Sequence, residues 1–224
     1  MAKVLVTGGA GFIGSSVAKK CIENGHEVVI LDNLSSGSNE VLEHLESLGI
    51  RAVIGDIRDP YSLQRAMHGC DAVVHLAAQI SVPASIANPQ ENNSINVEGT
   101  QLILDYCKQF NVKRVIVASS AAVYGQEDTM PLKEENAGDL LSPYAESKWK
   151  NEQQIIASRL NGQNTVALRL FNVYGPGQRA DGGYAAVIPK FIDMMVNGKA
   201  PSINGDGLHT RDFVHVDDVA KLIL

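Results

Sequence analysis

The stretch Val4-Leu5-Val6-Thr7-Gly8-Gly9-Ala10-Gly11-Phe12-Ile13-Gly14 decides the fold. Apolar residues run directly into a glycine-rich turn, and an apolar helical pattern follows over 12–22, which predicts a buried strand, a tight turn and a helix. Gly8 would let the chain turn, Gly11 would let a pyrophosphate approach the backbone, and Gly14 would let the helix pack close to the strand. Structural glycines at a turn are the alternative, but the strand before them and the helix after them favour a dinucleotide site.

Composition restricts the class of protein. The chain has 224 residues, enough for one sizeable domain, or one domain and part of another. A net charge of −6 and the lack of a basic stripe argue against nucleic-acid binding. No apolar run is long enough to cross a bilayer and no signal peptide is evident, so we expect a cytoplasmic protein without a membrane partner. Cys21, Cys70 and Cys107 are widely spaced in apolar stretches, so we expect reduced core thiols and no metal site.

Strands and helices alternate along the chain. After the first strand, further buried strands are predicted over 27–31, 52–54, 72–76 and 112–118, and helices over 38–47, 61–68 and 96–110. The segment 81–89 contains two prolines and is predicted to form a loop or short helical turns. Because each strand is a continuous apolar run, the fold class is α/β, a Rossmann-like doubly wound parallel sheet with helices on both faces.

Polar residues follow several of these strands. Asp32 ends the second strand, where a carboxylate can accept hydrogen bonds from both adenosine ribose hydroxyls and would repel a 2′-phosphate, so the predicted cofactor is NAD rather than NADP. A turn aspartate is the alternative. Asp56 and Ile57 follow the third strand, where an adenine could be met, although this segment alone would pass as an ordinary loop. His75, near the end of the fourth strand, is interpreted as a packed histidine rather than a catalyst.

A candidate catalytic group follows the fifth strand. That strand leads to Ser120, at the sheet edge where ligands bind in open α/β folds. Ser142 is a good N-cap for a helix on which Tyr144 and Lys148, four residues apart, share one face. A lysine ammonium beside a tyrosine should favour the phenolate and lower the tyrosine pKa, and Ser120 could donate a hydrogen bond to the same substrate oxygen. A surface Tyr/Lys pair is the alternative, but a nucleotide fold with a serine after strand five favours catalysis.

These motifs together resemble a known family. From Val4 to about Val219 the chain is similar to the extended short-chain dehydrogenases/reductases and, within them, to the NAD-dependent nucleotide-sugar epimerases and dehydratases of the UDP-glucose 4-epimerase type. The resemblance rests on Thr7-Gly8-x-x-Gly11-x-x-Gly14, Asp32-Asn33, Asp56-Ile57, Leu76-Ala77-Ala78, Asn96, Ser120, Tyr144-x-x-x-Lys148 and Arg169-x-Phe171-Asn172.

The resemblance implies a set of ligand-binding residues. The implied NAD contacts are Gly8, Gly11, Phe12, Ile13, Asp32, Asn33, Leu34, Ser35, Ser36, Gly37, Asp56, Ile57, Leu76, Ala77, Ala78, Gln79, Ile80, Asn96, Tyr144, Lys148 and Phe171. The implied nucleotide-sugar contacts are Ser120, Tyr144, Asn172, Val187, Asn204 and Arg211. The Arg211 guanidinium suits a diphosphate, with a surface arginine paired with Asp212 as the alternative. The family often has a lysine at the position of Ile80.

The implied reaction is C4 epimerisation of a UDP-hexose, either UDP-glucose/UDP-galactose or their N-acetylated forms. Tyr144 would take the 4-OH proton while NAD takes the C4 hydride, and hydride would return to the other face of a 4-keto sugar. Related 4,6-dehydratases carry an acid pair after the catalytic hydroxyl, whereas Ala121 and Ala122 follow Ser120 here and cannot act as acids or bases. Another nucleotide-sugar oxidoreductase or dehydratase, or an NAD-binding module without turnover, are the alternatives.

The resemblance also implies how the chain is divided and assembled. We expect an NAD-binding domain over 1–181 and a partial, apparently truncated nucleotide-sugar-binding subdomain over 182–224, because the family normally continues beyond a segment like Asp212–Val219. We also expect a homodimer, because the predicted helices over 96–110 and 144–160 resemble the pair that forms a four-helix interface in relatives.

Overall fold

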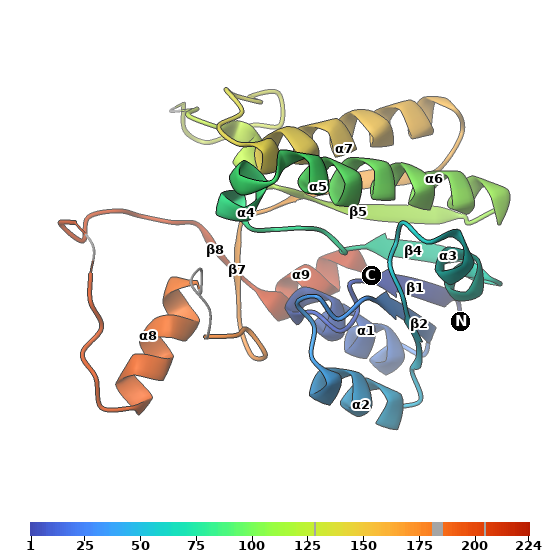
Figure 1. The fold of residues 1–224 in the computed structure, drawn as a ribbon, viewed down its shortest axis with the longest axis horizontal. Coiled ribbons are helices and arrows are strands. Elements are labelled where there is room, and N and C mark those ends of the chain that lie inside the picture. Colours follow the sequence, from blue (N-terminus) through green and yellow to red (C-terminus); the bar gives the residue numbers. More distant parts are fainter. Residues whose placement is uncertain (128, 181–185, 204) are drawn as a thin grey trace.

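The computed structural model describes residues 1–127, 129–180, 186–203 and 205–224, and its centre is a six-stranded parallel sheet (Figure 1). The order of strands changes direction between the first and fourth strands of the chain, as in a Rossmann-like doubly wound sheet, so the predicted fold class is confirmed. In spatial order the strands are β3 (Arg51–Ile54), β2 (Glu27–Asp32), β1 (Lys3–Thr7), β4 (Ala72–His75), β5 (Arg114–Ser120) and β6 (Thr165–Leu170).

Helices cover both faces of this sheet (Figure 1). Val4 and Val6 of β1 pack with one group of helices, and Leu5 between them packs with the other, which explains why the strand is apolar throughout. The first group is α1 (Phe12–Glu23), α2 (Asn39–Ser47) and α9 (Val216–Ile223). The second group is α3 (Pro60–Met67), α6 (Gly99–Gln109) and α7 (Pro143–Leu160).

Short helical segments connect β4 to α6 and follow β5. They are α4 (Val82–Ala87), α5 (Pro89–Asn93), the π-helical turn η1 (Ser94–Glu98) and, after β5, the 3-10 turn η2 (Ala121–Tyr124). The helix predicted over 96–110 therefore begins as a π-helical turn. The segment 81–89, predicted to form a loop or short helical turns, forms helical turns. Strand β6 was not assigned from the sequence, where Arg169 interrupts its apolar run.

The last part of the chain leaves the sheet and returns to it. β7 (Asn172–Tyr174) and β8 (Phe213–His215) form a separate two-stranded parallel sheet, and α8 (Val187–Val196) stands apart from the two helical layers (Figure 1). α9 then packs on α1, and Val219, Ala220 and Ile223 are buried in the same core as Val4 and Val6. The last helix of the segment 182–224 thus has its apolar face buried against the larger domain.

The three cysteines are free and buried, as predicted. Burial raises the pKa of the Cys21 and Cys70 thiols to about 11 and that of Cys107 to about 12. Within the described ranges, no helix combines the length and apolar character needed to span a bilayer.

Candidate active site

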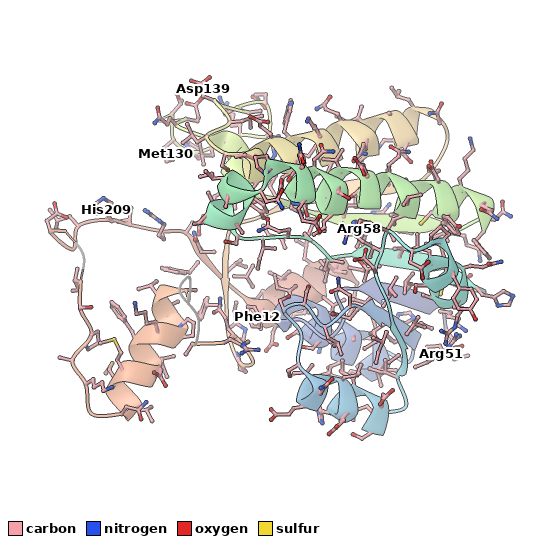
Figure 2. The ribbon with its side chains drawn as sticks, viewed as in Figure 1. Phe12, Arg51, Arg58, Met130, Asp139 and His209 are labelled. Atoms are coloured by element: carbon pink, nitrogen blue, oxygen red, sulfur yellow. The ribbon has the colours of Figure 1, made fainter. Side chains whose placement is uncertain are left out.

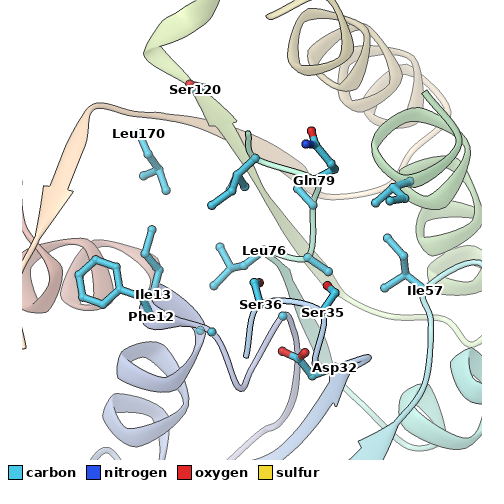
Figure 3. A pocket seen from close by; sticks show the side chains of 18 of the residues that line it. Phe12, Ile13, Asp32, Ser35, Ser36, Ile57, Leu76, Gln79, Ser120 and Leu170 are labelled. Atoms are coloured by element: carbon cyan, nitrogen blue, oxygen red, sulfur yellow. The ribbon is translucent and has the colours of Figure 1, made fainter. Parts of the chain in front are cut away.

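A cavity of about 640 Å³ opens at the carboxyl edge of the sheet, near the ends of β1 and β4 where the strand order changes direction. This is the place where open α/β sheets bind ligands. Phe12, Ile13 and Leu170 lie on one side of the cavity and Ile57 on the other (Figure 3). The predicted residues that line it are Gly8, Gly11, Phe12, Ile13, Asp32, Asn33, Ser35, Ser36, Asp56, Ile57, Leu76, Ala77, Ala78, Gln79, Ile80, Ser120, Tyr144, Lys148 and Phe171.

The turn after β1 leaves no room for side chains at its glycines. Gly8 has a φ of 69°, in the left-handed region that residues with a Cβ seldom adopt. A Cβ on Gly14 would lie 2.0 Å from the carbonyl oxygen of Gly8, so α1 can start this close to the strand only with glycine there. Gly11 precedes α1 and offers no side-chain cap, which leaves the first amides of the helix for a ligand. This cradle fits a pyrophosphate.

Asp32 joins the end of β2 to the glycine-rich turn. Its Oδ2 accepts a hydrogen bond from the Ala10 amide at 2.9 Å, and its Oδ1 accepts one from the Leu34 amide at 2.8 Å. The side chain is buried, yet it lines the cavity. Because each carboxylate oxygen can accept more than one hydrogen bond, Asp32 can support the turn and still receive ribose hydroxyls.

Arg58 holds Asp56 on the opposite side of the cavity. Its Nε and Nη2 donate to Asp56 Oδ1 and Oδ2 at 2.9 and 2.8 Å, and its Nη1 donates to Glu91 of α5 at 3.0 Å. The guanidinium therefore lies between the β3–α3 connection and the helices above it (Figure 2), and it lowers the pKa of Asp56. Ile57 beside this pair is buried in the core and contributes an apolar surface.

Asn96 fixes the loop that follows β4. Its Oδ1 accepts from the Gln79 amide at 2.8 Å, and its Nδ2 donates to the Gln79 carbonyl at 2.9 Å and to Ser147 Oγ at 3.0 Å. The side chain is buried in η1 and is not among the residues that line the cavity. In this structure Asn96 thus aligns Gln79 and the neighbouring loop against α7.

His75 is packed at the end of β4, as predicted, and its ring is neutral. Thr100 Oγ1 donates to the Asn96 carbonyl at 2.6 Å, so it must accept from the Nε2–H of His75, 3.0 Å away. The His75 Nδ1 then accepts from Thr7 Oγ1 at 2.7 Å. Burial lowers the pKa of His75 to about 3, so the ring stays neutral near neutral pH.

Helix α7 begins as the sequence predicts. Ser142 is the N-cap, and its Oγ accepts from the Ala145 amide at 3.1 Å. The amide of Tyr144 donates to Ser85 Oγ of α4 at 3.2 Å, which secures the first turn. The candidate base therefore stands on a well-anchored helix end.

The side chains of Ser120, Tyr144 and Lys148 meet at one end of the cavity. The Lys148 Nζ lies 5.9 Å from the centre of the Tyr144 ring and donates to the Ala118 carbonyl of β5 at 2.8 Å. Ser120, whose Oγ accepts from the Ala122 amide at 3.1 Å, lines the cavity with Tyr144, and its hydroxyl acts to lower the pKa of that phenol. A substrate hydroxyl bound between Ser120 and Tyr144 could therefore form hydrogen bonds with both side chains.

The electrostatics differ from one expectation. Burial raises the pKa of Tyr144, and the neighbouring Ser120 hydroxyl acts in the opposite direction. Burial also lowers the pKa of Lys148 to about 8. The expectation that Lys148 brings the pKa of Tyr144 below its ordinary value is wrong for this structure, because both side chains are desolvated and the Lys148 amine is directed to Ala118.

Several predicted ligand residues lie away from the described cavity. Gly37 packs on Ala10, and the Leu34 amide is bound to Asp32. The residues in this group are Leu34, Gly37, Asn96, Asn172, Val187 and Arg211. Asn172 Nδ2 donates to the Asp212 carbonyl at 3.0 Å, Val187 begins α8, and the exposed Arg211 donates from Nη1 to the Thr210 carbonyl at 2.7 Å. Asn204 lies outside the described residues.

Other residues line the cavity without having been predicted as ligands. They are Gly14, Leu31, Gly55, Ser81, Ile95, Ala118, Ser119, Leu170, Val173 and Gln178. Leu31, Ser119 and Leu170 lie at the carboxyl ends of strands, a position that could have identified them. Gln178 gave no such signal. Its Nε2 donates to the Val173 carbonyl at 3.1 Å, and among the described residues its buried Oε1 has no partner, which leaves an acceptor for a ligand.

Comparison with known proteins identifies the family of this chain. Residues 4–224 match the model of the NAD dependent epimerase/dehydratase family. The chain belongs to this family. The family assignment confirms the predicted resemblance and NAD as the cofactor.

Members of the family with different activities are similar to this chain. A putative UDP-glucose 4-epimerase of Methanocaldococcus jannaschii is 42% identical over 221 residues, which are 97% of this chain and 71% of that protein. A UDP-N-acetylglucosamine 4-epimerase of Methanobrevibacter ruminantium M1, solved with UDP-N-acetylmuramic acid, is 42% identical with a TM-score of 0.93 over 98% of this chain and 71% of its own. A UDP-N-acetyl-alpha-D-glucosaminuronate decarboxylase of Bacillus cytotoxicus is 35% identical over 225 residues, 98% of this chain and 69% of that protein.

Proposed function

We propose that the protein is an NAD-dependent 4-epimerase of a UDP-hexose, acting on UDP-glucose/UDP-galactose or on their N-acetylated forms. The observation that carries the proposal is that Ser120, Tyr144 and Lys148 line the dinucleotide cavity together, with Ala121 and Ala122 next after Ser120 in the chain. A reaction that needs hydride transfer and one proton suits this site. The named activities of the 42% identical relatives support the same choice.

The side chains have separate roles in this proposal. Tyr144 takes the proton of the sugar 4-OH and later returns it, and Ser120 donates a hydrogen bond to the same oxygen. Lys148, held by the Ala118 carbonyl, positions its amine beside Tyr144 and towards the nicotinamide ribose. Burial of Tyr144 and Lys148 excludes water from the proton transfer.

The cofactor site follows from the lining of the cavity. Gly8, Gly11 and the start of α1 hold the pyrophosphate, Asp32 receives the adenosine ribose, and Asp56 and Ile57 lie at the adenine. Bound NAD supplies the acceptor and donor of hydride at C4 of the sugar. Asp32 also selects NAD over NADP, because its carboxylate would repel a 2′-phosphate.

The substrate side and the assembly are further parts of the proposal. Asn172 of β7, with Val187, Asn204 and Arg211 from the segment 182–224, contacts the nucleotide sugar. The chain is divided into an NAD-binding domain over 1–181 and a partial nucleotide-sugar-binding subdomain over 182–224, whose last helix, α9, packs on the NAD-binding domain. The homodimer forms through α6 and α7, which lie side by side (Figure 1).

A decarboxylase or dehydratase is the second candidate, because a decarboxylase is 35% identical over nearly the whole chain. Both reactions would share the Ser120–Tyr144–Lys148 group, but they need further acid or base groups that Ala121 and Ala122 cannot supply. The third candidate is an NAD-binding module without turnover.

One assay separates the three candidates. The NAD-loaded protein is incubated with UDP-glucose, UDP-N-acetylglucosamine and UDP-glucuronate in turn, and the products are followed by ¹H NMR. We expect interconversion of the 4-epimers. A 4-keto-6-deoxy product or released CO₂ would instead support the second candidate, and bound NAD with no product from any sugar would support the third.

A further inference from the structure

Glu152 is a buried acid that the proposed reaction does not use. It lies on α7 one turn after Lys148 and two turns after Tyr144, and it is 8% exposed. Residues four apart share a helix face, so the three side chains point to the same side of α7. A carboxylate buried this deeply needs charged or hydrogen-bonding partners.

The partners of Glu152 come from the ends of β5 and β6. Its Oε1 accepts from Ser119 Oγ at 2.6 Å and from Arg169 Nε at 2.9 Å, and its Oε2 accepts from Arg169 Nη2 at 2.9 Å. Ser119 and Arg169 are directly opposite in the register of β5 and β6. One carboxylate thus joins α7 to both strands at the edge of the cavity.

Arg169 extends the connection to the segment that follows Ser120. Its guanidinium lies 4.7 Å from the centre of the Tyr124 ring in η2, and its Nη1 donates to the Glu134 carbonyl at 2.9 Å. The Tyr124 ring in turn packs on Phe171 with 5.9 Å between ring centres. The Glu152–Arg169 pair therefore contacts the chain on both sides of Ser120, at Ser119 and at Tyr124.

A buried ion pair contributes little stability compared with apolar residues of the same shape, but its hydrogen bonds are directional. Here they fix the end of β5 relative to the helix that carries the candidate base. We propose that Glu152 is a positioning residue that, through Ser119 and Arg169, sets the position of Ser120 relative to Tyr144 on α7. This inference rests on the proposed function for the role of Tyr144 in turnover, but not for the relative position of the two side chains.

Two variants test the link at different points. Ser119→Ala removes the bond between Glu152 and β5 and leaves the ion pair, whereas Glu152→Gln removes the charge and keeps the shape. Ser158→Ala is the matched control, because Ser158 is a buried serine of α7 whose hydroxyl bonds to Gln163, away from the cavity. Circular dichroism and NAD affinity are measured first for each variant.

The decisive measurement is the ionisation of Tyr144. It is followed in the NAD-loaded protein by ¹³C NMR of tyrosine Cζ, with Tyr144→Phe to assign the signal. The groups that face the Tyr144 side chain are Ser120 from β5 and Lys148 from α7, while His75 from β4 stays neutral. Because the Ser120 hydroxyl acts to lower the pKa of Tyr144, its displacement should raise that pKa by about one pH unit in Ser119→Ala and Glu152→Gln, but not in Ser158→Ala.

Turnover gives a second readout. If the protein is a 4-epimerase, both variants should lose about tenfold in kcat at pH 7, with KM nearly unchanged and the pH–rate profile moved to higher pH. Folded variants that bind NAD and leave the pKa of Tyr144 as in the parent would overturn the positioning role. Should Glu152→Gln not fold, Ser119→Ala decides alone. Should the parent convert no UDP-sugar, the proposed function fails while the NMR titration still tests this inference.

Discussion

Replacing Lys148 with methionine should stabilise the nucleotide-free protein near neutral pH, although it removes a group proposed for catalysis. Lys148 is buried, with 5% of its surface exposed, and this burial lowers its pKa from the ordinary 10.5 to about 8. Because the pKa in the folded protein is the lower of the two, the unfolded chain binds more protons between pH 8 and 10.5. The stability of the parent protein should therefore rise with pH through this range, whereas the methionine variant lacks this rise.

The magnitude follows from the two pKa values. At pH 7 the burial of the Lys148 charge costs about 3 kcal/mol, using 1.36 kcal/mol for each tenfold change in proton affinity. Methionine gives up the hydrogen bond from Nζ to the Ala118 carbonyl, which is worth about 1 kcal/mol. An unbranched methionine fits the space of the lysine stem. The net expectation is a gain of about 2 kcal/mol at pH 7.

The assay is urea unfolding of both proteins, freed of nucleotide, at pH 7 and at pH 9.5. Taking the difference between variant and parent at each pH cancels the titration of Tyr144 and of the cysteines, which both proteins share. The advantage of Lys148→Met should shrink by about 2 kcal/mol between the two pH values. A variant less stable than the parent at pH 7, or an advantage that is equal at both pH values, would refute the reasoning.

Four further outcomes are expected. Tyr144→Phe should keep the fold and NAD binding and lose about 10²–10⁴-fold in kcat, so turnover at the parent rate would mean that another residue is the base. Asp32 should make NAD bind tightly and NADP poorly; fluorescence titration of both cofactors checks this, and equal affinities would contradict it. Gly14→Ala should weaken NAD binding and lower the melting temperature, because the new Cβ would lie 2.0 Å from the Gly8 carbonyl oxygen. Analytical ultracentrifugation at micromolar concentration should give a homodimer, and a pure monomer would disprove the interface.

Much of the fold can be predicted from local sequence. The strand, turn and helix over residues 3–23 follow from an apolar run, three glycines at fixed spacing and a helical apolar period. Ser142 caps α7 as predicted, because an N-cap depends on one side chain and the amides just after it. The same local rules gave the carboxyl ends of the strands, and hence the side of the sheet on which the cavity lies.

Contacts between segments far apart in the chain could not be read in this way. Asn96 holds Gln79 and Ser147 rather than lining the cavity, and nothing near it in the sequence indicates those partners. α9, near the end of the sequence, packs on α1, near its beginning. The spacing of residues along one helix says which side chains share a face, but not which strand they will meet.

The sequence by itself thus determined the doubly wound sheet, the glycine cradle, the place of Ser120 at the end of a strand and the shared helix face of Tyr144 and Lys148, because each depends on local backbone preferences and on the period of apolar residues. Only the tertiary structure decided how those groups ionise. Desolvation of Tyr144 and Lys148, and the Glu152–Arg169 pair beside them, arise when β5, β6 and α7 assemble and exclude water. Such burial is a property of the packed fold, and it reversed the pKa expected for Tyr144 from its neighbour in the sequence.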